Sequence, residues 1–535
     1  MKWKIILTAV WMVGVAARAS FFTDADINHA TLARQHVFMV NKEGGCMDPA
    51  HQWGWDTNAL DKVEVFSVSN SLHQIEDGLR AWSLTKDAAG QPTPRVIVFV
   101  HGGMNPYSAS RNRLQDTNFL NSLAASNCYP IFVVWNSGPF SSYWEHLTSI
   151  RQGEKHPWIG GFTAPFVLVS DLARGVARLP TTLSGRIYSD WETTEMPNGP
   201  KVKRWENFEE LIVASPNAPA VHPAQHEDGK RTWPERGLHM TEYIATQPTK
   251  IATLPILDGL GTEAWDIMLR RTRTLFDSTG SYEIGRMIKN LSNPEKIPVT
   301  NRLEKIQHWL DPVADDEHIT LTNAQRGAMY FLSHEFAEWS QTNWLDARHT
   351  AQPLAFEFYG HSMGTIVLNE MFRNQPSIMA DRVAYLAAAC SIEDFKTAMF
   401  PYLTAHTNTQ FYSLSLPRIR ERDEFPLKVP APFVRDLIVR GSLLNWIDDI
   451  LAKPNSVTDR TLGAWENLVR ALPDIPADLR PRTHFRECDL EPQRAWSGGE
   501  GTREPQVHAD FTKTIFWSTN FLWPARTDEM LLRKN

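Results

Sequence analysis

The sequence predicts an α/β fold with a mostly parallel sheet and a large, largely helical insertion. Several apolar runs are continuous rather than alternating, which is typical of strands buried on both faces of a parallel sheet. Segments with helical periodicity lie between these runs, as the crossovers of a parallel sheet require. One interval between successive strands is too long for a crossover, and we expect it to form the insertion.

The expected core elements follow one another along the chain. Strands are predicted at residues 95–103, 129–138, 353–362, 381–390 and 409–417, with a weaker candidate at 483–489. Helices are predicted at 112–126, at 323–341, and at 365–376, which ends at Pro376. Upstream, residues 20–90 indicate edge strands and one helix near 71–86. The core is therefore expected in residues 20–140 and 323–535.

The interval at 141–322 is the expected insertion. Apolar residues at helical spacing predict helices around 168–179 and 265–276, the second with Thr262 as N-cap. Residues 215–236 are rich in Pro and polar residues, and we expect them to form a loop.

The first residues resemble an export signal. Two lysines precede an apolar run from Ile5 to Ala17, and Ala17-Arg18-Ala19 follows as a small-x-small cleavage pattern. We expect residues 1–19 to be a signal peptide cleaved after Ala19, so that the protein is exported to the periplasm or secreted. An uncleaved membrane anchor is the alternative. No later stretch is apolar over the roughly 18 residues of a membrane span, so no integral membrane association is expected after cleavage.

Charge and cysteine content exclude some functions. The net charge is −7, and no basic footprint for nucleic acid is evident. The four cysteines lie far apart, and no CxxC pattern occurs. Export would permit disulfides, but the sequence does not choose a pairing. We expect Cys390 to be a buried thiol or half of one disulfide.

The sequence GHSMG at 360–364 is the clearest chemical motif. A serine on a tight strand-to-helix turn needs glycines two positions before and after it, because larger side chains would collide. Ser362 has Gly360 and Gly364 at these positions, a predicted strand before it and a predicted helix after it. The pattern predicts a nucleophile, whereas the simpler alternative is an ordinary loop. His361 is expected to pack or to line the cleft rather than act as a base.

A nucleophilic serine needs N–H donors for the oxyanion that its attack creates. The backbone N–H of Met363, directly after the serine, is one expected donor. Gly102 and Gly103 follow an earlier strand and would let the backbone approach the substrate oxygen, so Gly103 or Met104 is expected to supply the second donor. An ordinary glycine turn is the alternative.

The two motifs together, HGG at 101–103 and GHSMG at 360–364, resemble those of the α/β-hydrolase superfamily, of the lipase or esterase type. The resemblance covers roughly residues 95–138 and 353–523. It implies a doubly wound, mostly parallel sheet and a catalytic set in the chain order Ser, acid, His. Insertions in this family often cover the active site, which implies a lid-like or cap-like role for residues 141–322.

This chain order places the histidine after Ser362. His406 precedes a strand and would lie on the wrong side of the sheet, and His484 lies near the start of the last strand. His508 follows the last strand, which is where the family has its base, so we predict that His508 is the base. We expect a helix after it with Phe511, Ile515 and Leu522 on one face.

The acid that orients the histidine is expected in the loop after the 409–417 strand. We prefer Glu421, with Asp423 next. The simpler alternative is that these acids are solvated and paired with neighbouring arginines. Further candidates are Glu424 in the same loop, Glu393 and Asp394 one strand earlier (where Ser391 looks like a helix cap), and Asp459.

The expected function is an exported serine hydrolase that cleaves carboxylic esters of small molecules or lipids. The alternatives are amide, thioester or acyl-transfer chemistry on the same residues, or a catalytically silent hydrolase fold used for binding. No cofactor is expected. His222 and His226 have i, i+4 spacing, but Pro223 argues against the helix that would align them on a metal.

Overall fold

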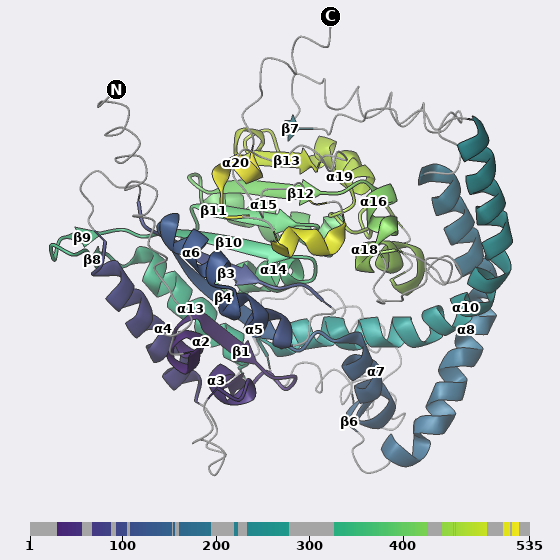
Figure 1. The fold of residues 1–535 in the computed structure, drawn as a ribbon, viewed down its shortest axis with the longest axis horizontal. Coiled ribbons are helices and arrows are strands. Elements are labelled where there is room, and N and C mark those ends of the chain that lie inside the picture. The colour runs from purple at the N-terminus through teal and green to yellow at the C-terminus, as the bar shows by residue number, and fades with distance from the viewer. Residues whose placement is uncertain are drawn as a thin grey trace, which may run out of the picture.

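The protein is described here by a computed structural model. It describes residues 29–55, 67–86, 93–103, 107–151, 154–155, 160–193, 219–222, 233–277, 326–424, 441–452, 454, 456–488, 505, 507–513 and 516–523. Its centre is a nine-stranded sheet in the order β2-β1-β4-β3-β10-β11-β12-β13-β7 (Figure 1). All neighbouring strands pair in parallel except β1 and β2. The α/β fold with a mostly parallel sheet is therefore confirmed.

Six of these strands correspond to the continuous apolar runs predicted from the sequence. The strands of the sheet are β1 (Val37–Val40), β2 (Cys46–Met47), β3 (Arg95–Val100), β4 (Cys128–Trp135), β7 (Ala220–His222), β10 (Ala355–His361), β11 (Arg382–Leu386), β12 (Gln410–Ser415) and β13 (Thr483–Glu487). Two small hairpins pair β5 (Ile150–Arg151) with β6 (Glu154–Lys155), and β8 (Trp344–Leu345) with β9 (Ala351–Gln352). Each of the six predicted strands is present. In β4 every residue is buried, as expected for a strand covered on both faces.

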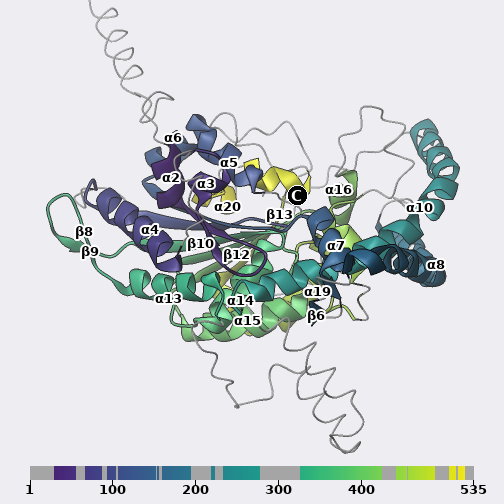
Figure 2. The same cartoon turned by 90° about the horizontal axis from the view of Figure 1, so that it is seen from below.

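Helices cover both faces of the sheet (Figure 2). One layer contains α2 (His29–His36), α5 (Ser108–Gln115), α6 (Thr117–Ala125) and α20 (Thr519–Leu522). The opposite layer contains α13 (Ala328–Gln341), α14 (Gly364–Asn374), α15 (Ile392–Ala405) and α19 (Trp465–Ala471). Shorter or peripheral helices are α3 (Pro49–Gln52), α4 (Val68–Ser83), α7 (Pro139–Thr148), α16 (Arg418–Asp423) and α18 (Leu443–Trp446). The π-helix η3 (Ile447–Leu451) continues α18, and 3₁₀ turns occupy Leu472–Asp474, Arg480–Arg482 and His508–Lys513.

The insertion contains two long helices that pack along each other, α8 (Gly160–Thr193) and α10 (Trp233–Thr274) (Figure 1). Glycines permit their close approach. A Cβ at Gly175 would lie 2.0 Å from the carbonyl oxygen of Pro255, and one at Gly259 would lie 2.4 Å from that of Asp171. Both helices extend well beyond the predicted segments. Thr262 lies inside α10, so its prediction as an N-cap was wrong.

The loop predicted at 215–236 was wrong in two places. Residues 220–222 form β7, which pairs in parallel with β13 as the last strand of the sheet, and α10 already begins at Trp233. The short run at 220–222 has little strand signal of its own, and its partner β13 is distant in sequence. The insertion therefore contributes an edge strand to the core.

Two helix predictions and the disulfide alternative also need correction. The helix expected at 112–126 is two helices, α5 and α6, separated at Asp116. The single helix expected after His508 is a 3₁₀ turn followed by the four-residue α20, while Ile515 lies outside the described residues. Side chains from the sheet hold this segment instead, because Arg95 donates to the carbonyl of Trp517 and Arg486 to that of Phe521. All four cysteines are free thiols.

The topology marks one place on the sheet. Connections run from β3 outward to β4, and from β10 outward in the opposite direction through β11, β12 and β13. The strand order therefore reverses between the neighbours β3 and β10. In open α/β sheets, binding sites form outside the carboxyl ends of the strands at such a switch point. The HGG and GHSMG motifs directly follow or end these two strands.

Among the described residues, no helix combines the length and apolar character needed to cross a membrane.

Candidate active site

Ser362 lies at the turn between β10 and α14, in a backbone conformation that residues other than glycine rarely adopt. Its φ is 52°, in the left-handed region. Hydrogen bonds fix this turn to the neighbouring strand connection. The N–H of Ser362 donates to the carbonyl of Leu386 over 2.9 Å, and its own carbonyl accepts from the N–H of Ala389 over 3.1 Å. This is the sharp strand-to-helix turn that the motif predicted.

The two glycines of the motif stand where a side chain has little room. A Cβ at Gly364 would lie 2.2 Å from the carbonyl oxygen of Val100 in the neighbouring strand β3. A Cβ at Gly360 would lie 3.0 Å from the backbone nitrogen of Thr365, in the first turn of α14. Close backbone packing therefore requires glycine at 364, whereas a larger residue at 360 would need its neighbours Thr365 and Leu368 to shift slightly.

The HGG segment lies directly against the serine. A Cβ at Gly102 would lie 2.6 Å from the Cβ of Ser362, and one at Gly103 would lie 2.5 Å from the sulfur of Met363. The segment after β3 therefore packs against Ser362, the predicted nucleophile, and against Met363, whose N–H is a predicted donor to the oxyanion. Met104 lies outside the described residues.

The peptide between Gly102 and Gly103 has a fixed orientation. The carbonyl of Gly102 accepts hydrogen bonds from Nδ1 of His101 over 2.7 Å and from the hydroxyl of Ser137 over 3.1 Å. Nε2 of His101 accepts from the N–H of Trp135, so the ring proton resides on Nδ1. Because the peptide is trans, the N–H of Gly103 points away from these groups. The sequence prediction gave no role to Ser137, which follows β4.

His508 and Glu421 are brought together from segments far apart in the chain. Nδ1 of His508 lies 3.2 Å from Oε2 and 3.4 Å from Oε1 of Glu421. Both side chains are buried. Glu421 lies on α16, shortly after β12, which is where the acid was expected. A buried carboxylate at Nδ1 fixes the ring and leaves Nε2 for proton transfer.

The surroundings of His508 favour its protonated form. Burial lowers the pKa of its imidazole, but the carboxylates of Glu421 and Glu424 outweigh this effect, so the pKa lies above its ordinary value. Glu424 is a second acidic neighbour, and burial raises the pKa of its carboxyl despite the nearby His508. From the sequence, Glu424 is predicted only as an alternative to Glu421 for the acid that orients the histidine.

The other candidate residues lie elsewhere or outside the description. Asp423 ends α16, but its side chain is outside the described part of the chain. Glu393 and Asp394 occupy the first turn of α15 behind the cap formed by Ser391, as predicted. Nε2 of His406 lies 2.6 Å from the carbonyl of Pro376, and the ring of His484 stacks on Tyr412. Asp459 accepts from the backbone N–H of Ser456.

The predicted nucleophile is closed off from solvent. Ser362 is only 1% exposed, and its Oγ makes no hydrogen bond to any described residue. The Ser–His hydrogen bond is therefore not formed in this state. Hydrogen bonds between catalytic groups are often long without substrate and shorten when it binds, so this geometry does not exclude the pair.

A buried ion network positions the short helix that carries Glu421. Arg418, at the start of α16, donates to Asp449 of the π-helix over 2.9 Å and lies 3.5 Å from Asp448. The backbone N–H of Arg418 also donates to the carboxylate of Glu466. From the sequence, a pairing of Arg418 with acids of its own loop was only the simpler alternative, and these partners on η3 and α19 could not be predicted because their approach is a tertiary feature.

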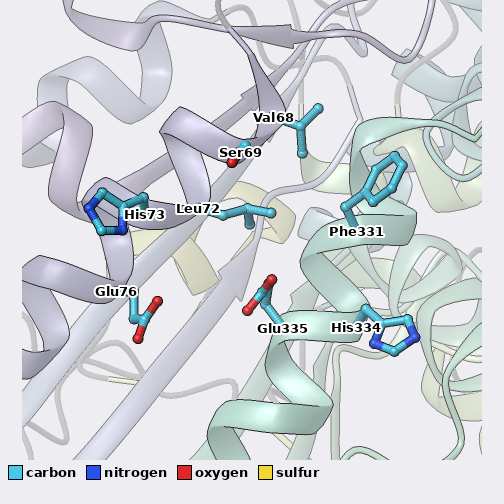
Figure 3. Close-up of a pocket in the computed structure, with 8 residues that line it drawn as sticks. All are labelled: Val68, Ser69, Leu72, His73, Glu76, Phe331, His334 and Glu335. Atoms are coloured by element: carbon cyan, nitrogen blue, oxygen red, sulfur yellow. The ribbon is translucent and has the colours of Figure 1, made fainter. Parts of the chain in front are cut away.

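A surface pocket of about 470 Å³ lies away from these residues, between α4 and α13 (Figure 3). His73 and Glu76 of α4 and His334 and Glu335 of α13 are among the residues that line it. His73 pairs with Asp77, and Glu76 pairs with Arg80. Within the described ranges, no group of three or more His, Cys, Asp or Glu side chains is arranged to hold a metal. His226 lies outside those ranges.

Comparisons of the chain with protein-family models, with curated proteins and with solved structures found no match. The functional conclusion therefore rests on the geometry and chemistry of the residues themselves.

Proposed function

We propose that this protein is a serine hydrolase with the α/β-hydrolase fold, which cleaves carboxylic esters through Ser362, His508 and Glu421. The observation that carries the proposal is the convergence at one switch point of a left-handed serine between two closely packed glycines, a glycine segment against it, and a buried His–Glu pair. Each part has a simple structural explanation alone, but their combination matches the requirements of acyl transfer.

The mechanism assigns each group one task. Nε2 of His508 takes the proton of Ser362 as Oγ attacks the ester carbonyl carbon. The oxyanion of the tetrahedral intermediate accepts from the N–H groups of Met363 and Gly103. The intermediate then releases the alcohol, which receives the proton from His508, and leaves an acyl-serine. Water attacks this ester with His508 as base, and the acid leaves.

Glu421 holds the imidazole ring and stabilises its positive charge during both steps. Its burial matters, because a carboxylate and an imidazolium attract more strongly where water is excluded. The proposed substrate is the ester of a small molecule or a lipid. Large apolar side chains exposed on the long helices of the insertion, such as Phe162, Phe166 and Ile256, favour a lipid, with α8 and α10 as a lid or cap. Export by residues 1–19 remains part of the proposal, and those residues lie outside the described ranges.

A fluorophosphonate probe tests this proposal directly, because it labels only an activated serine. We expect wild-type protein to be labelled, Ser362→Ala to lose all labelling, and His508→Ala to lose about 10⁴-fold or more of the ester hydrolysis rate. Glu421→Gln should lower kcat strongly while leaving the fold intact. Nitrophenyl esters of increasing chain length would then separate esterase from lipase preference.

Ser333→Ala is the matched control. Ser333 is also fully buried, but its hydroxyl bonds only to the carbonyl of Met329 within α13. This variant should be labelled like the wild type. Folded wild-type protein that shows no labelling at Ser362 would contradict the proposal.

The closure of the site favours one second candidate, a catalytically silent hydrolase fold used for binding. Ser362 is buried and its Oγ is not hydrogen-bonded to a described residue. A silent fold would give no labelling and no esterase activity under any assay condition, including detergents that open a lid.

A further inference from the structure

The peptide unit that follows the proposed base is approached by two side chains. The carbonyl oxygen of His508 lies 3.2 Å from Nε2 of His361. A carbonyl can only accept, so Nε2 of His361 carries the proton and donates it. The N–H of Ala509, which belongs to the same peptide, lies close enough to the carboxylate of Glu424 to lower the pKa of that carboxyl.

His361 connects this peptide to the other half of the site. Its ring centroid is 4.9 Å from that of His508, and a Cβ at Gly102 would lie 2.8 Å from its Nδ1. The ring therefore lies between the HGG segment and the base. His361 is the last residue of β10 and directly precedes Ser362, so the residue that contacts the base is adjacent in sequence to the nucleophile.

Glu424 reaches the same peptide from the segment that carries Glu421. Its backbone carbonyl accepts from the N–H of Gly441 over 3.2 Å, which fixes the end of α16. The charged groups that face His508 and Glu424 in this region are Glu421, His361 and Asp510.

We propose that His361 and Glu424 form a clamp on the His508–Ala509 peptide, and that both are positioning residues for the base. This inference rests on the proposed hydrolase function. The 3₁₀ turn at His508–Lys513 is short, and hydrogen-bond geometry in such turns is poorer than in an α-helix, so contacts from outside the turn help to fix its geometry. A displacement of about 1 Å of a catalytic group can cost about 100-fold in rate.

Replacements at His361 separate the hydrogen bond from the shape of the ring. His361→Phe keeps a buried ring without a donor, and His361→Gln keeps an N–H at similar reach. We expect His361→Phe to lower kcat about 10- to 100-fold with KM unchanged, and His361→Gln to recover most of the loss. Wild-type kcat in His361→Phe, or equal kcat losses in both variants that follow their thermal stability, would overturn the clamp.

Replacements at Glu424 separate its charge from its hydrogen bond. Glu424→Gln keeps an acceptor for the Ala509 N–H but removes a charge that favours protonated His508. The acidic limb of the pH profile of kcat/KM should therefore move to lower pH, with kcat within about threefold of wild type. Glu424→Leu removes both and should lower kcat. In the double variant with His361→Phe, the losses should be less than additive, because both residues act on one peptide.

Hydrogen exchange at Ala509 provides a readout that does not depend on activity. Its amide should be protected in the wild type and in Glu424→Gln, and should exchange faster in Glu424→Leu. If the wild type is inactive but this pattern holds, the proposed function fails and the clamp stands. The opposite outcome is a wild type that is active and labelled at Ser362, with amide exchange and kcat unchanged in both Glu424→Leu and His361→Phe. That result would overturn the clamp but leave the proposed function standing.

Discussion

At the residue scale, the turn at Ser362 combines strain with unusually close packing. A left-handed conformation costs a non-glycine residue about 1–3 kcal/mol. The hydrogen bonds from the β11 connection hold it, and the hydroxyl of Thr365 also donates to the carbonyl of Ser362 over 2.7 Å. Strain of this kind persists at functional sites where the surroundings over-determine the backbone.

Gly364→Ala tests whether the space at this turn is as tight as the geometry indicates. The new Cβ would lie 2.2 Å from the carbonyl oxygen of Val100, so strand β3 or helix α14 must shift. We expect the free energy of unfolding, measured by urea denaturation, to fall by about 1–3 kcal/mol or more. Labelling at Ser362 should also be lost.

Gly161→Ala is the control for this substitution. A Cβ at Gly161, near the start of α8, would meet no atom within 4 Å. Alanine there should leave stability unchanged or raise it by up to about 1 kcal/mol, because it favours the helix. Equal effects at the two positions would show that backbone freedom, rather than space, selects glycine at 364.

At the element scale, buried polar contacts tie α10 to α7 and to the segment after β4. Arg271 of α10 donates to one carboxylate oxygen of Glu145 on α7, over 3.0 Å from Nε and 2.6 Å from Nη2. It also donates to the carbonyl of Asn136, next to the β4 end. Both charged side chains are almost fully buried. The packing of α10 against α7 therefore depends on an ion pair, Arg271–Glu145, that is almost completely shielded from water.

Arg271→Met should destabilise the protein by about 3–5 kcal/mol, because it leaves the buried carboxylate of Glu145 with only the more distant Lys42, at 4.0 Å, as a described cationic neighbour. The double variant Glu145→Leu with Arg271→Met removes both charges and should recover at least half of that loss. Chemical denaturation of the two single variants and the double variant gives the coupling. Single and double variants of equal stability would show that the buried charge is not the cause.

At the scale of the whole molecule, the candidate site exists because distant segments meet at one end of the sheet. HGG follows β3, GHSMG ends β10, Glu421 follows β12 and His508 follows β13. In a parallel sheet the carboxyl ends of all strands lie along the same edge, so these segments converge. The strands that carry the site are interior members of the sheet.

This arrangement predicts a gradient of protection across the sheet. Hydrogen exchange measured by mass spectrometry should be slowest for β3, β10, β11 and β12, which have neighbours on both sides. The edge strands β2 and β7 should exchange faster, because each pairs on one side and is only two or three residues long. Slow exchange at β7 equal to that of β10 would contradict this picture.

The strength of the local signals explains which predictions succeeded. A run such as Val96–Val100 predicts a buried strand from its own residues. The GHSMG motif predicts a sharp turn once a strand is expected before it and a helix after it. Residues 220–222 become a strand only because β13 offers an unpaired edge. Likewise, the helix expected after His508 is replaced by a turn that His361 contacts and by a later segment whose carbonyls accept from Arg95 and Arg486.

The sequence by itself determined the class of fold, the core strands, the turn at Ser362 and the short set of residues that would serve with it, because these depend on local pattern and spacing. Only the tertiary structure decided which acid reaches His508, that Ser137 and His101 orient the Gly102 carbonyl, and that the insertion returns a strand to the sheet. The physical reason is that a side chain's partner depends on where the backbone brings distant segments, and spacing along the chain does not encode that distance.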